Sequence, residues 1–240
     1  MDVIRKLTGE EALTIGVDLS DDQLTQFARY HKFMVAENRK YNLTGICTPE
    51  EIVTKHFIDS LLCAKLDLIK GKESLIDVGS GAGLPGIPLK ILYPELKLVL
   101  LEATKKKASF LEETIGLLEM DDAVVINDRA ENVGRTGGYR ESFDVAVSRA
   151  VAALPVLLEY CLPLVSTGGY FLALKGPGLE EEIDAATGAA KVLGGKLIGI
   201  HDFVLPHDKG NRKIAAYRKV NSSELKYPRR PGIPAKRPLK

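Results

Sequence analysis

Tryptophan is absent from this chain of 240 residues, and cysteine and histidine are scarce, with three and four copies. The cysteines, at Cys47, Cys63 and Cys161, are odd in number and lack the spacing of metal or redox motifs. This pattern excludes a disulfide framework and predicts buried free thiols in a reducing cytoplasm. The histidines show no zinc-ligand spacing, so we expect no metal ion. Without tryptophan, stacking on a nucleic-acid base would depend on tyrosine and phenylalanine.

A charge excess of either sign and long apolar runs are missing too. The chain carries 33 basic and 32 acidic residues, although a local basic patch can still bind nucleic acid. The longest apolar region, residues 143–165, is interrupted by charged residues and a proline, which excludes a membrane span. Residues 1–7 lack the apolar core of a signal peptide. With 45% hydrophobic and 27% charged residues, the chain has the composition of a soluble globular protein, and we expect a cytoplasmic one.

What the chain does have is a glycine-rich loop in residues 74–86, Ser-Leu-Ile-Asp-Val-Gly-Ser-Gly-Ala-Gly-Leu-Pro-Gly. A short apolar run ends near Asp77, and three alternating glycines follow at Gly79, Gly81 and Gly83. Glycine lets the backbone turn sharply and approach a ligand closely. A strand that leads into such a loop, with a helix behind it, predicts a site for a nucleotide-like cofactor.

The identity of that cofactor depends on the residues around the glycines. Gly81, Gly83 and Gly86 match the dinucleotide fingerprint GxGxxG, which leaves an NAD(P)-dependent oxidoreductase as an alternative. That fingerprint normally follows its strand directly, whereas here Asp77 stands two residues before Gly79. Asp-x-Gly-x-Gly-x-Gly resembles motif I of the S-adenosylmethionine methyltransferases, and we favour that reading. A glycine-rich turn without a ligand is disfavoured, because glycines cost chain entropy.

Hydrophobic periodicity divides the chain into a helical part and an alternating part. Helices are predicted at residues 3–16, 20–42 and 49–66, so that residues 1–70 form a helical N-terminal region. From residue 71 onward, strands and helices alternate, which indicates a mostly parallel sheet covered by helices. The expected strands are 74–78, 96–101, 123–127, 143–148, 169–175, 196–204 and 213–219, and the expected helices are 84–93, 104–119, 151–165 and 178–194.

The last two predicted strands have no helix between them, so they must form an antiparallel hairpin. The prediction is therefore an α/β fold with a seven-stranded, mostly parallel sheet, the Rossmann-like class I methyltransferase fold, over residues 71–220. A nicotinamide-binding sheet ordinarily has six parallel strands, which is a second argument against NAD.

The tail, residues 221–240, carries four prolines and six basic residues against one acidic residue. We expect it to be an extended arm with splayed side chains that contacts RNA phosphates, and the alternative is a solvated, disordered end. The candidate RNA contacts are Lys175, Arg229, Arg230, Lys236 and Arg237.

In such a sheet the ligand lies over the carboxyl ends of the strands. Glu102, at the end of the second strand, is expected to accept the ribose hydroxyls, although it could also cap the next helix. Ala103 and Thr104 would border the ribose or adenine. After the third strand, the backbone of Ala130 and Glu131 would read the adenine, and a polar contact from either Asp128 or Glu131 stays open.

The fourth strand ends at Arg149, where the substrate is expected. The chain lacks the Asn/Asp-Pro-Pro-aromatic tetrad of exocyclic-amine methyltransferases and the Pro-Cys of C5-pyrimidine methyltransferases, which leaves a ring nitrogen or a hydroxyl as acceptor. Guanine N7 presents a lone pair and requires no general base, so catalysis would be alignment. We expect Arg149 to contact cofactor, guanine or phosphate, rather than to pair with a buried acid. His56, Asp59 and Ser60 share a helix face, either for acid–base work or for packing.

Several segments together resemble one family, RsmG, bacterial methyltransferases of small-subunit ribosomal RNA formerly called glucose-inhibited division protein B. The Gly-Leu-Pro-Gly variant of the loop and the Pro-Arg-Arg-Pro-Gly tail are specific to it. The matching segments are Tyr41-Asn-Leu-Thr44, Lys55-His-Phe-Ile-Asp-Ser60, Asp77-Val-Gly-Ser-Gly-Ala-Gly-Leu-Pro-Gly86, Ser148-Arg-Ala150 and Tyr227-Pro-Arg-Arg-Pro-Gly-Ile-Pro-Ala-Lys-Arg-Pro-Leu239. One departure is Glu37, where the family often has tryptophan before the asparagine.

The resemblance implies methylation of guanine N7 in the 530 loop of 16S rRNA, with S-adenosylmethionine as cofactor and the small ribosomal subunit as partner. It implies cofactor contacts at Gly79, Leu84, Glu102, Ala103, Thr104, Ala130, Glu131 and Arg149. The alternatives are a methyltransferase acting on a small molecule, the oxidoreductase named above, and a non-enzymatic ribosome-associated RNA binder. We expect a monomer.

Overall fold

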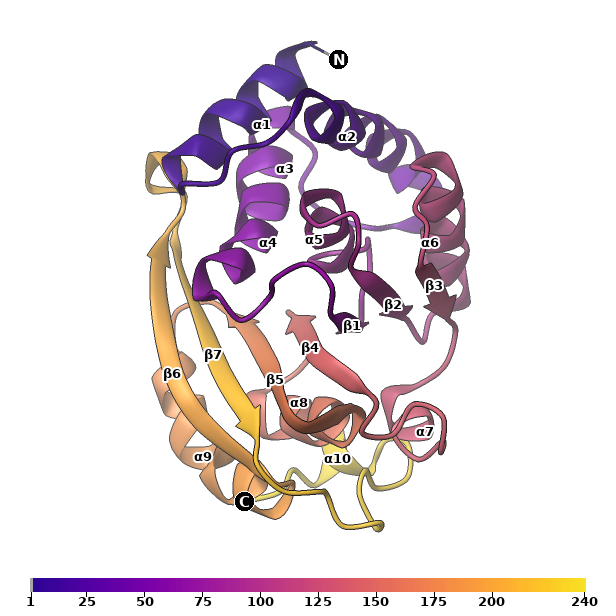
Figure 1. Ribbon diagram of the computed structural model, residues 1–240, viewed down its shortest axis with the longest axis vertical. Helices are drawn as coiled ribbons and strands as arrows, with labels where there is room; N and C mark the ends of the chain where they lie inside the picture. The colour runs from indigo at the N-terminus through magenta and orange to yellow at the C-terminus, as the bar shows by residue number, and fades with distance from the viewer. Residues whose placement is uncertain (1) are drawn as a thin grey trace.

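The computed structural model describes residues 2–240 as a central sheet with helices on both faces (Figure 1). The seven strands run in the order β3-β2-β1-β4-β5-β7-β6. β1 to β5 are parallel, whereas β7 is antiparallel to both of its neighbours, β5 and β6. The predicted seven-stranded sheet and its C-terminal hairpin are therefore confirmed. The strands are β1 Ser74–Val78, β2 Lys97–Leu101, β3 Ala123–Ile126, β4 Phe143–Arg149, β5 Val165–Lys175, β6 Gly195–Val204 and β7 Asn211–Lys219.

Two apolar clusters, one on each face, bury the sheet. Within β1, Leu75 belongs to the cluster on one face and its neighbour Ile76 to the cluster on the other, because successive strand side chains point to opposite faces. This explains why the adjacent residues Leu75 and Ile76 of β1 are both apolar. The covering helices are α5 Gly86–Leu92, α6 Lys105–Leu117, α7 Ala130–Val133, α8 Leu154–Cys161, α9 Leu179–Val192 and α10 Ile233–Lys236.

The largest differences from the sequence prediction concern α8 and two short helices. The predicted helix 151–165 is shorter: α8 is followed by a 3₁₀ turn, Leu162–Leu164, and β5 already begins at Val165. α7 and α10 were not predicted, since four residues are too few to show a helical period. Among residues 2–240, no helix combines the length and the apolar composition needed to cross a membrane.

The N-terminal region is helical, as predicted. It begins with α1 Asp2–Thr14 and α2 Asp21–Tyr41, and Ser20 starts α2 through a capping box with Gln23. The predicted helix 49–66 is continuous but changes pitch: α3 Pro49–Ile52 leads into a π-helical turn η1 Val53–Ile58, then α4 Asp59–Leu61 and a 3₁₀ segment η2 Leu62–Leu66. A π turn is rare and re-aims side chains. Phe27 and Phe57 pack these helices into the same cluster as Leu75 of β1.

The tail does not project from the molecule, so the prediction of an extended arm with splayed side chains is wrong. Residues 221–240, here called the C-terminal strap, pack back onto α7 and α8. Arg229 pairs with the fully buried Glu159, with Nε–Oε1 at 2.9 Å and Nη2–Oε2 at 2.6 Å. Arg140 donates to the carbonyls of Ser223 and Tyr227 at 2.7 and 2.6 Å. The strap's partners lie far away in the sequence, where composition cannot reveal them.

The cysteines are only partly as expected. Cys63 and Cys161 are buried free thiols, whereas Cys47 is exposed, so the prediction of three buried thiols is wrong at that position.

Candidate active site

The glycine-rich loop after β1 has a backbone that only glycine adopts readily. Gly79, Gly81 and Gly83 have φ values of +76°, +59° and +91°. Asp77 is fully buried at the end of β1, and its Oδ2 accepts a hydrogen bond from the Gly86 N–H at 2.9 Å. The glycines and Asp77 therefore determine the conformation of the loop. Which of them can contact a ligand depends on the space around the loop.

Two hollows flank this loop at the carboxyl ends of the strands, and both are lined by Gly79 and Val151. The larger, of about 460 Å³, is called the polar hollow. The smaller, of about 140 Å³, is called the apolar hollow. A Cβ placed on Gly79 would lie 2.5 Å from Cγ2 of Val151, so glycine is required where the two hollows meet. This is the edge of the sheet at which α/β proteins bind nucleotides.

The apolar hollow has the dimensions and lining that suit an adenine ring. Its walls come from the ends of β1 and β2, the start of α7 and the ring of Tyr160. Ala103 and Ala130 line it, and Thr104 is the N-cap residue of α6 just beyond; their contact with a cofactor stays a prediction. The carboxylate of Glu131 accepts from the Gly232 N–H of the C-terminal strap at 2.9 Å. Asp128 is exposed at the rim, so of the two candidate acids it presents the more accessible carboxylate.

The sequence left two roles open for Glu102, a ribose contact and a cap for the next helix, and the structure shows the cap. Its Oε1 accepts from Thr104 N–H at 2.7 Å, which is the helix-capping alternative, and its Oε2 accepts from Gly81 N–H at 3.0 Å. The carboxylate thus ties β2 to the glycine loop. Contact with a ribose stays a prediction.

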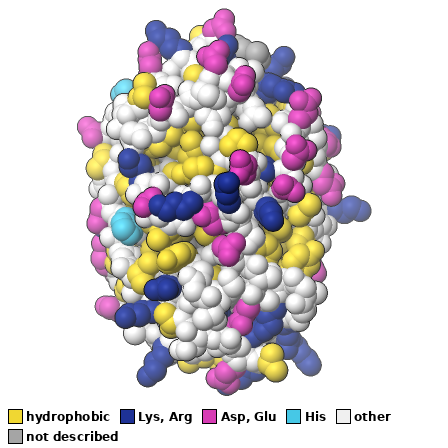
Figure 2. All heavy atoms as spheres, in the orientation of Figure 1, with side chains coloured by type: hydrophobic (Ala, Val, Ile, Leu, Met, Phe, Trp, Pro, Cys, Tyr) yellow, Lys and Arg dark blue, Asp and Glu magenta, His cyan; other side chains and the backbone are white. Residues whose placement is uncertain are grey.

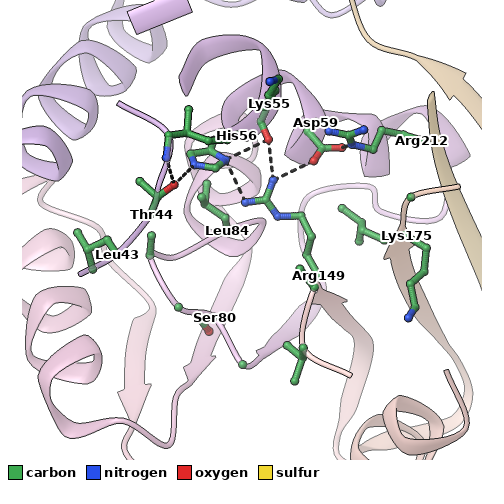
Figure 3. A pocket seen from close by; sticks show the side chains of 18 of the residues that line it. Leu43, Thr44, Lys55, His56, Asp59, Ser80, Leu84, Arg149, Lys175 and Arg212 are labelled. Carbon is green, nitrogen blue, oxygen red and sulfur yellow. Dashed lines mark hydrogen bonds and ion pairs between the residues drawn. The ribbon is translucent and has the colours of Figure 1, made fainter. Parts of the chain in front are cut away.

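The polar hollow contains an ion-pair network around Arg149 (Figure 3). Arg149 Nη1 donates to Asp59 Oδ2 at 2.9 Å and to the Lys55 carbonyl at 3.0 Å. Asp59 Oδ1 in turn receives Nε of Arg212 at 3.0 Å. Pairing of Arg149 with a buried acid, which the sequence analysis disfavoured, is therefore what the structure shows. Asp59 precedes Arg149 by 90 residues, and no sequence pattern relates that helix to this strand end.

His56 lies beside this network in its neutral form. Burial, reinforced by the positive charge of Arg149, lowers the pKa of His56 to about 4. Its Nδ1 lies 3.0 Å from the Lys55 carbonyl and its Nε2 lies 2.8 Å from Thr44 Oγ1. We assign the tautomer in which Nδ1–H donates to the carbonyl and Nε2 accepts from the hydroxyl. His56 faces Thr44 and Arg149, and Ser60 Oγ donates to the His56 carbonyl. These contacts favour the packing alternative over an acid–base pair of His56 with Asp59.

The structure separates the residues predicted to contact RNA. Lys175 lines the polar hollow, where its Nζ donates to Glu182 at 2.8 Å and to the Ala152 carbonyl at 2.8 Å. The guanidinium of Arg229 is used by Glu159, within the strap interface. The other three, Arg230, Lys236 and Arg237, are exposed on the strap.

Sequence reasoning missed several residues of the polar hollow. Arg212 belongs to no motif of the sequence analysis, and Thr44 appears there only as part of a segment that resembles the family. Lys55 contributes a carbonyl rather than its side chain, which no motif could indicate. Val151 reaches the hollow because Ala150 before it has a positive φ of 57°. Leu84, expected from the resemblance, does line the polar hollow. Within residues 2–240 no group of three or more His, Cys, Asp or Glu side chains is placed to hold a metal ion.

Comparison with solved structures agrees with this fold. The chain superimposes with a TM-score of 0.53 on a variant of MtNAS in complex with S-adenosylmethionine, at 18% identity, covering 92% of this chain and 89% of the other. It superimposes with a TM-score of 0.51 on M. jannaschii TYW2 in complex with AdoMet, at 17% identity, covering 65% and 74%. At these identities the likeness shows the fold, a class I methyltransferase fold.

Sequence comparison is more specific. The chain is 45% identical over 239 residues to Ribosomal RNA small subunit methyltransferase G of Pelotomaculum thermopropionicum, covering 100% of both chains. Residues 23–212 match the GidB family, described as rRNA small subunit methyltransferase G. This match is incompatible with the oxidoreductase alternative. The loop, the hollows and the full-length match lead to one conclusion, that the chain belongs to the rRNA small subunit methyltransferase G family.

Proposed function

We propose that this protein transfers a methyl group from S-adenosylmethionine to N7 of a guanine in the 530 loop of 16S rRNA. The observation that carries the proposal is the 45% identity over the whole chain to a relative named for ribosomal RNA of the small subunit. A ribosomal substrate supports a cytoplasmic location, and we propose that the protein acts there as a monomer.

The residues present fit S-adenosylmethionine, which supplies a methyl group activated on a sulfonium sulfur. The apolar hollow would hold the adenine between Ala103 and Ala130, with Glu102 at the ribose. The polar hollow begins at Gly79 and Gly81 and would hold the amino-acid end. Two arginines, one carboxylate and a neutral histidine leave a net positive charge there, which attracts a carboxylate.

The chemistry of the polar hollow favours an acceptor that needs no deprotonation. Asp59 is the sole carboxylate among the described residues that line this hollow, and both of its oxygens already receive guanidinium donors. His56 has a pKa near 4 and is therefore a poor general base at neutral pH. Guanine N7 carries its lone pair in the plane of the ring and needs only alignment with the methyl carbon. A hydroxyl acceptor would need a base that these residues do not offer.

The rim of the polar hollow carries cations from several elements. Lys107 opens α6 on one side, and Lys175 and Arg212 lie on β5 and β7. Figure 2 shows basic side chains interspersed with acidic ones across the middle of this face, below the N-terminal helices. Lys175 and Arg212 are paired with Glu182 and Asp59, so Lys107 is the rim cation that would contact a phosphate beside the target nucleotide.

The test is methylation in vitro of 30S subunits, naked 16S rRNA and free guanosine, with mapping of the product by mass spectrometry. We expect a single N7-methylguanine in the 530 loop of one or both RNA substrates and none on guanosine. Absence of a mark on every substrate, or methylation of guanosine at a rate equal to that of RNA, would overturn the proposal.

A further inference from the structure

The feature that the proposed function does not explain is the position of Asp59. This residue is 5% exposed and belongs to no loop of the cofactor fold. It begins α4, directly after the π-helical turn Val53–Ile58. Its two carboxylate oxygens receive two arginines from two different strands, Arg149 at the end of β4 and Arg212 in β7 (Figure 3). One side chain of the N-terminal region thus connects two strands at the polar hollow.

The π-helical turn provides a second hydrogen-bond acceptor for the same guanidinium. Within this turn the Lys55 carbonyl accepts from Arg149 Nη1 at 3.0 Å, in addition to the hydrogen bond from Nη1 to Asp59. The imidazole of His56 lies against Nη2, with Nδ1 at 3.5 Å. Two hydrogen bonds from residues 55–59 therefore hold Nη1 of Arg149, and the neutral His56 ring packs beside Nη2. π turns recur at functional sites because they re-aim backbone and side-chain groups in this way.

Electrostatics explains why a carboxylate is needed between the arginines. Arg149 and Arg212 are largely buried, with side chains 15% and 23% exposed. Two guanidiniums that approach one small region repel each other, and little water is present to screen them. A shared carboxylate between them offsets this repulsion. If it is removed, two partly desolvated cations are left without a counter-charge.

We propose that Asp59 is a positioning residue, which holds Arg149 and Arg212 together and aims Arg149 at the amino-acid end of the cofactor. This inference rests on the proposed function, because it assigns the carboxylate of S-adenosylmethionine to the polar hollow. Asp59 itself touches neither cofactor nor RNA. Its effect on binding is transmitted through Arg149.

The test compares two ligands that differ only at the amino-acid end. S-adenosylhomocysteine has that end, whereas 5′-methylthioadenosine has the adenosine and the sulfur but no amino-acid chain. Isothermal titration with both ligands is carried out on the wild-type protein and on Asp59→Asn. We expect the variant to bind S-adenosylhomocysteine about tenfold more weakly and to bind methylthioadenosine as the wild type does. Adding Arg212→Gln to the Asp59→Asn variant should restore part of the lost affinity, because it removes one of the two repelling cations.

Glu11→Gln is the matched control. Glu11 is 2% exposed and accepts from Thr54 Oγ1 of the same π turn at 2.9 Å, but it has no contact with Arg149. We expect this variant to leave the ratio of the two affinities unchanged. If Asp59→Asn does not fold by circular dichroism, the double variant is compared with Arg212→Gln alone. The affinity for S-adenosylhomocysteine relative to methylthioadenosine should then fall by less than tenfold, because Arg212→Gln has already removed one of the repelling cations.

Each result has a definite meaning. Equal weakening of both ligands, or no weakening of either, overturns the positioning role. A wild-type protein that binds neither ligand contradicts the proposed function instead, so the two failures are distinguishable.

Discussion

Asp77 is a carboxylate at the centre of the protein, and its burial has an energetic consequence. The side chain has no exposure to solvent, and its Oδ1 has no hydrogen-bond partner among the described residues. Burial raises the pKa of Asp77 from its ordinary 3.8 to about 7, while Gly86 N–H and Arg149 oppose the rise and Glu102 adds to it. The loop geometry therefore holds in place a group that prefers to be protonated.

This pKa predicts how stability depends on pH. Between about pH 4 and pH 7 the folded protein retains a proton on Asp77 that the unfolded chain has lost, so this residue lowers the free energy of unfolding as pH rises. The contribution is on the order of a few kcal/mol. We expect Asp77→Asn to remove it, so that the stability of the variant relative to wild type rises between about pH 4 and pH 7 and stays constant above. Urea unfolding followed by circular dichroism at several pH values measures the two curves. If the free energies of unfolding of wild type and variant run parallel across this pH range, the raised pKa of Asp77 is contradicted.

At the scale of single residues, sequence reasoning was strongest where a motif fixes the backbone. Gly79, Gly81 and Gly83 were found by spacing, and all three have the positive φ that requires glycine. It failed at Arg149, whose partner comes from a helix rather than from its own sheet. A motif records which residue types occur near each other in the chain, whereas an ion pair between distant segments leaves no such record.

At the scale of elements, the C-terminal strap differs most from its prediction. Its prolines and cations are typical of an RNA-binding arm. Its conformation, however, depends on individual ion pairs and hydrogen bonds with the rest of the protein. The pair of Arg229 and Glu159 joins the strap to α8, and the bond from Gly232 to Glu131 joins it to the wall of the apolar hollow. The strap thus supports the wall of the apolar hollow, where the proposed function places the cofactor.

Substitution of Arg229 tests this role. Arg229→Met leaves Glu159, which is fully buried, without its cation, and we expect the free energy of unfolding to fall by about 3–5 kcal/mol. Arg230→Met, at the exposed neighbouring position, is the control and should change stability little. Urea denaturation measures both. Equal stability of the two variants would show that the strap is an arm after all.

Most elements could be predicted, since the strands are apolar runs and the long helices have a clear period. The π turn could not, because it is an insertion of one residue into an otherwise regular helix and leaves the period almost unchanged. It is nevertheless the element that brings residues 55–59 to Arg149. The division at residues 70 and 220 stays a prediction.

At the scale of the whole molecule, the proposed function has RNA approach the polar hollow across the surface of a protein with nearly equal numbers of acidic and basic residues. Lys107 lines this hollow and forms no ion pair with any described residue, unlike Lys175, which Glu182 neutralises. The electrostatic potential that would attract RNA is therefore local, and it depends on unpaired cations such as Lys107 near the hollow.

Removal of one such cation should weaken RNA binding in a measurable way. We expect Lys107→Gln to lower affinity for 16S rRNA and to reduce the slope of log affinity against log salt by about one. Lys196→Gln, at an exposed position in β6, is the control and should leave the slope unchanged. Filter binding at several salt concentrations gives both slopes. An unchanged slope for Lys107→Gln would place the RNA elsewhere.

The place of β7 in the sheet has a consequence for how the protein is made. β7 is the last strand in the chain, yet it lies between β5 and β6 and pairs with both. While the chain is being synthesised from its N-terminus, β5 keeps an open edge and β6 has no neighbour until residues 211–219 emerge. The same late segment carries Arg212 to Asp59. A nascent chain therefore completes its sheet and joins Arg212 to Asp59 in one step, when residues 211–219 emerge.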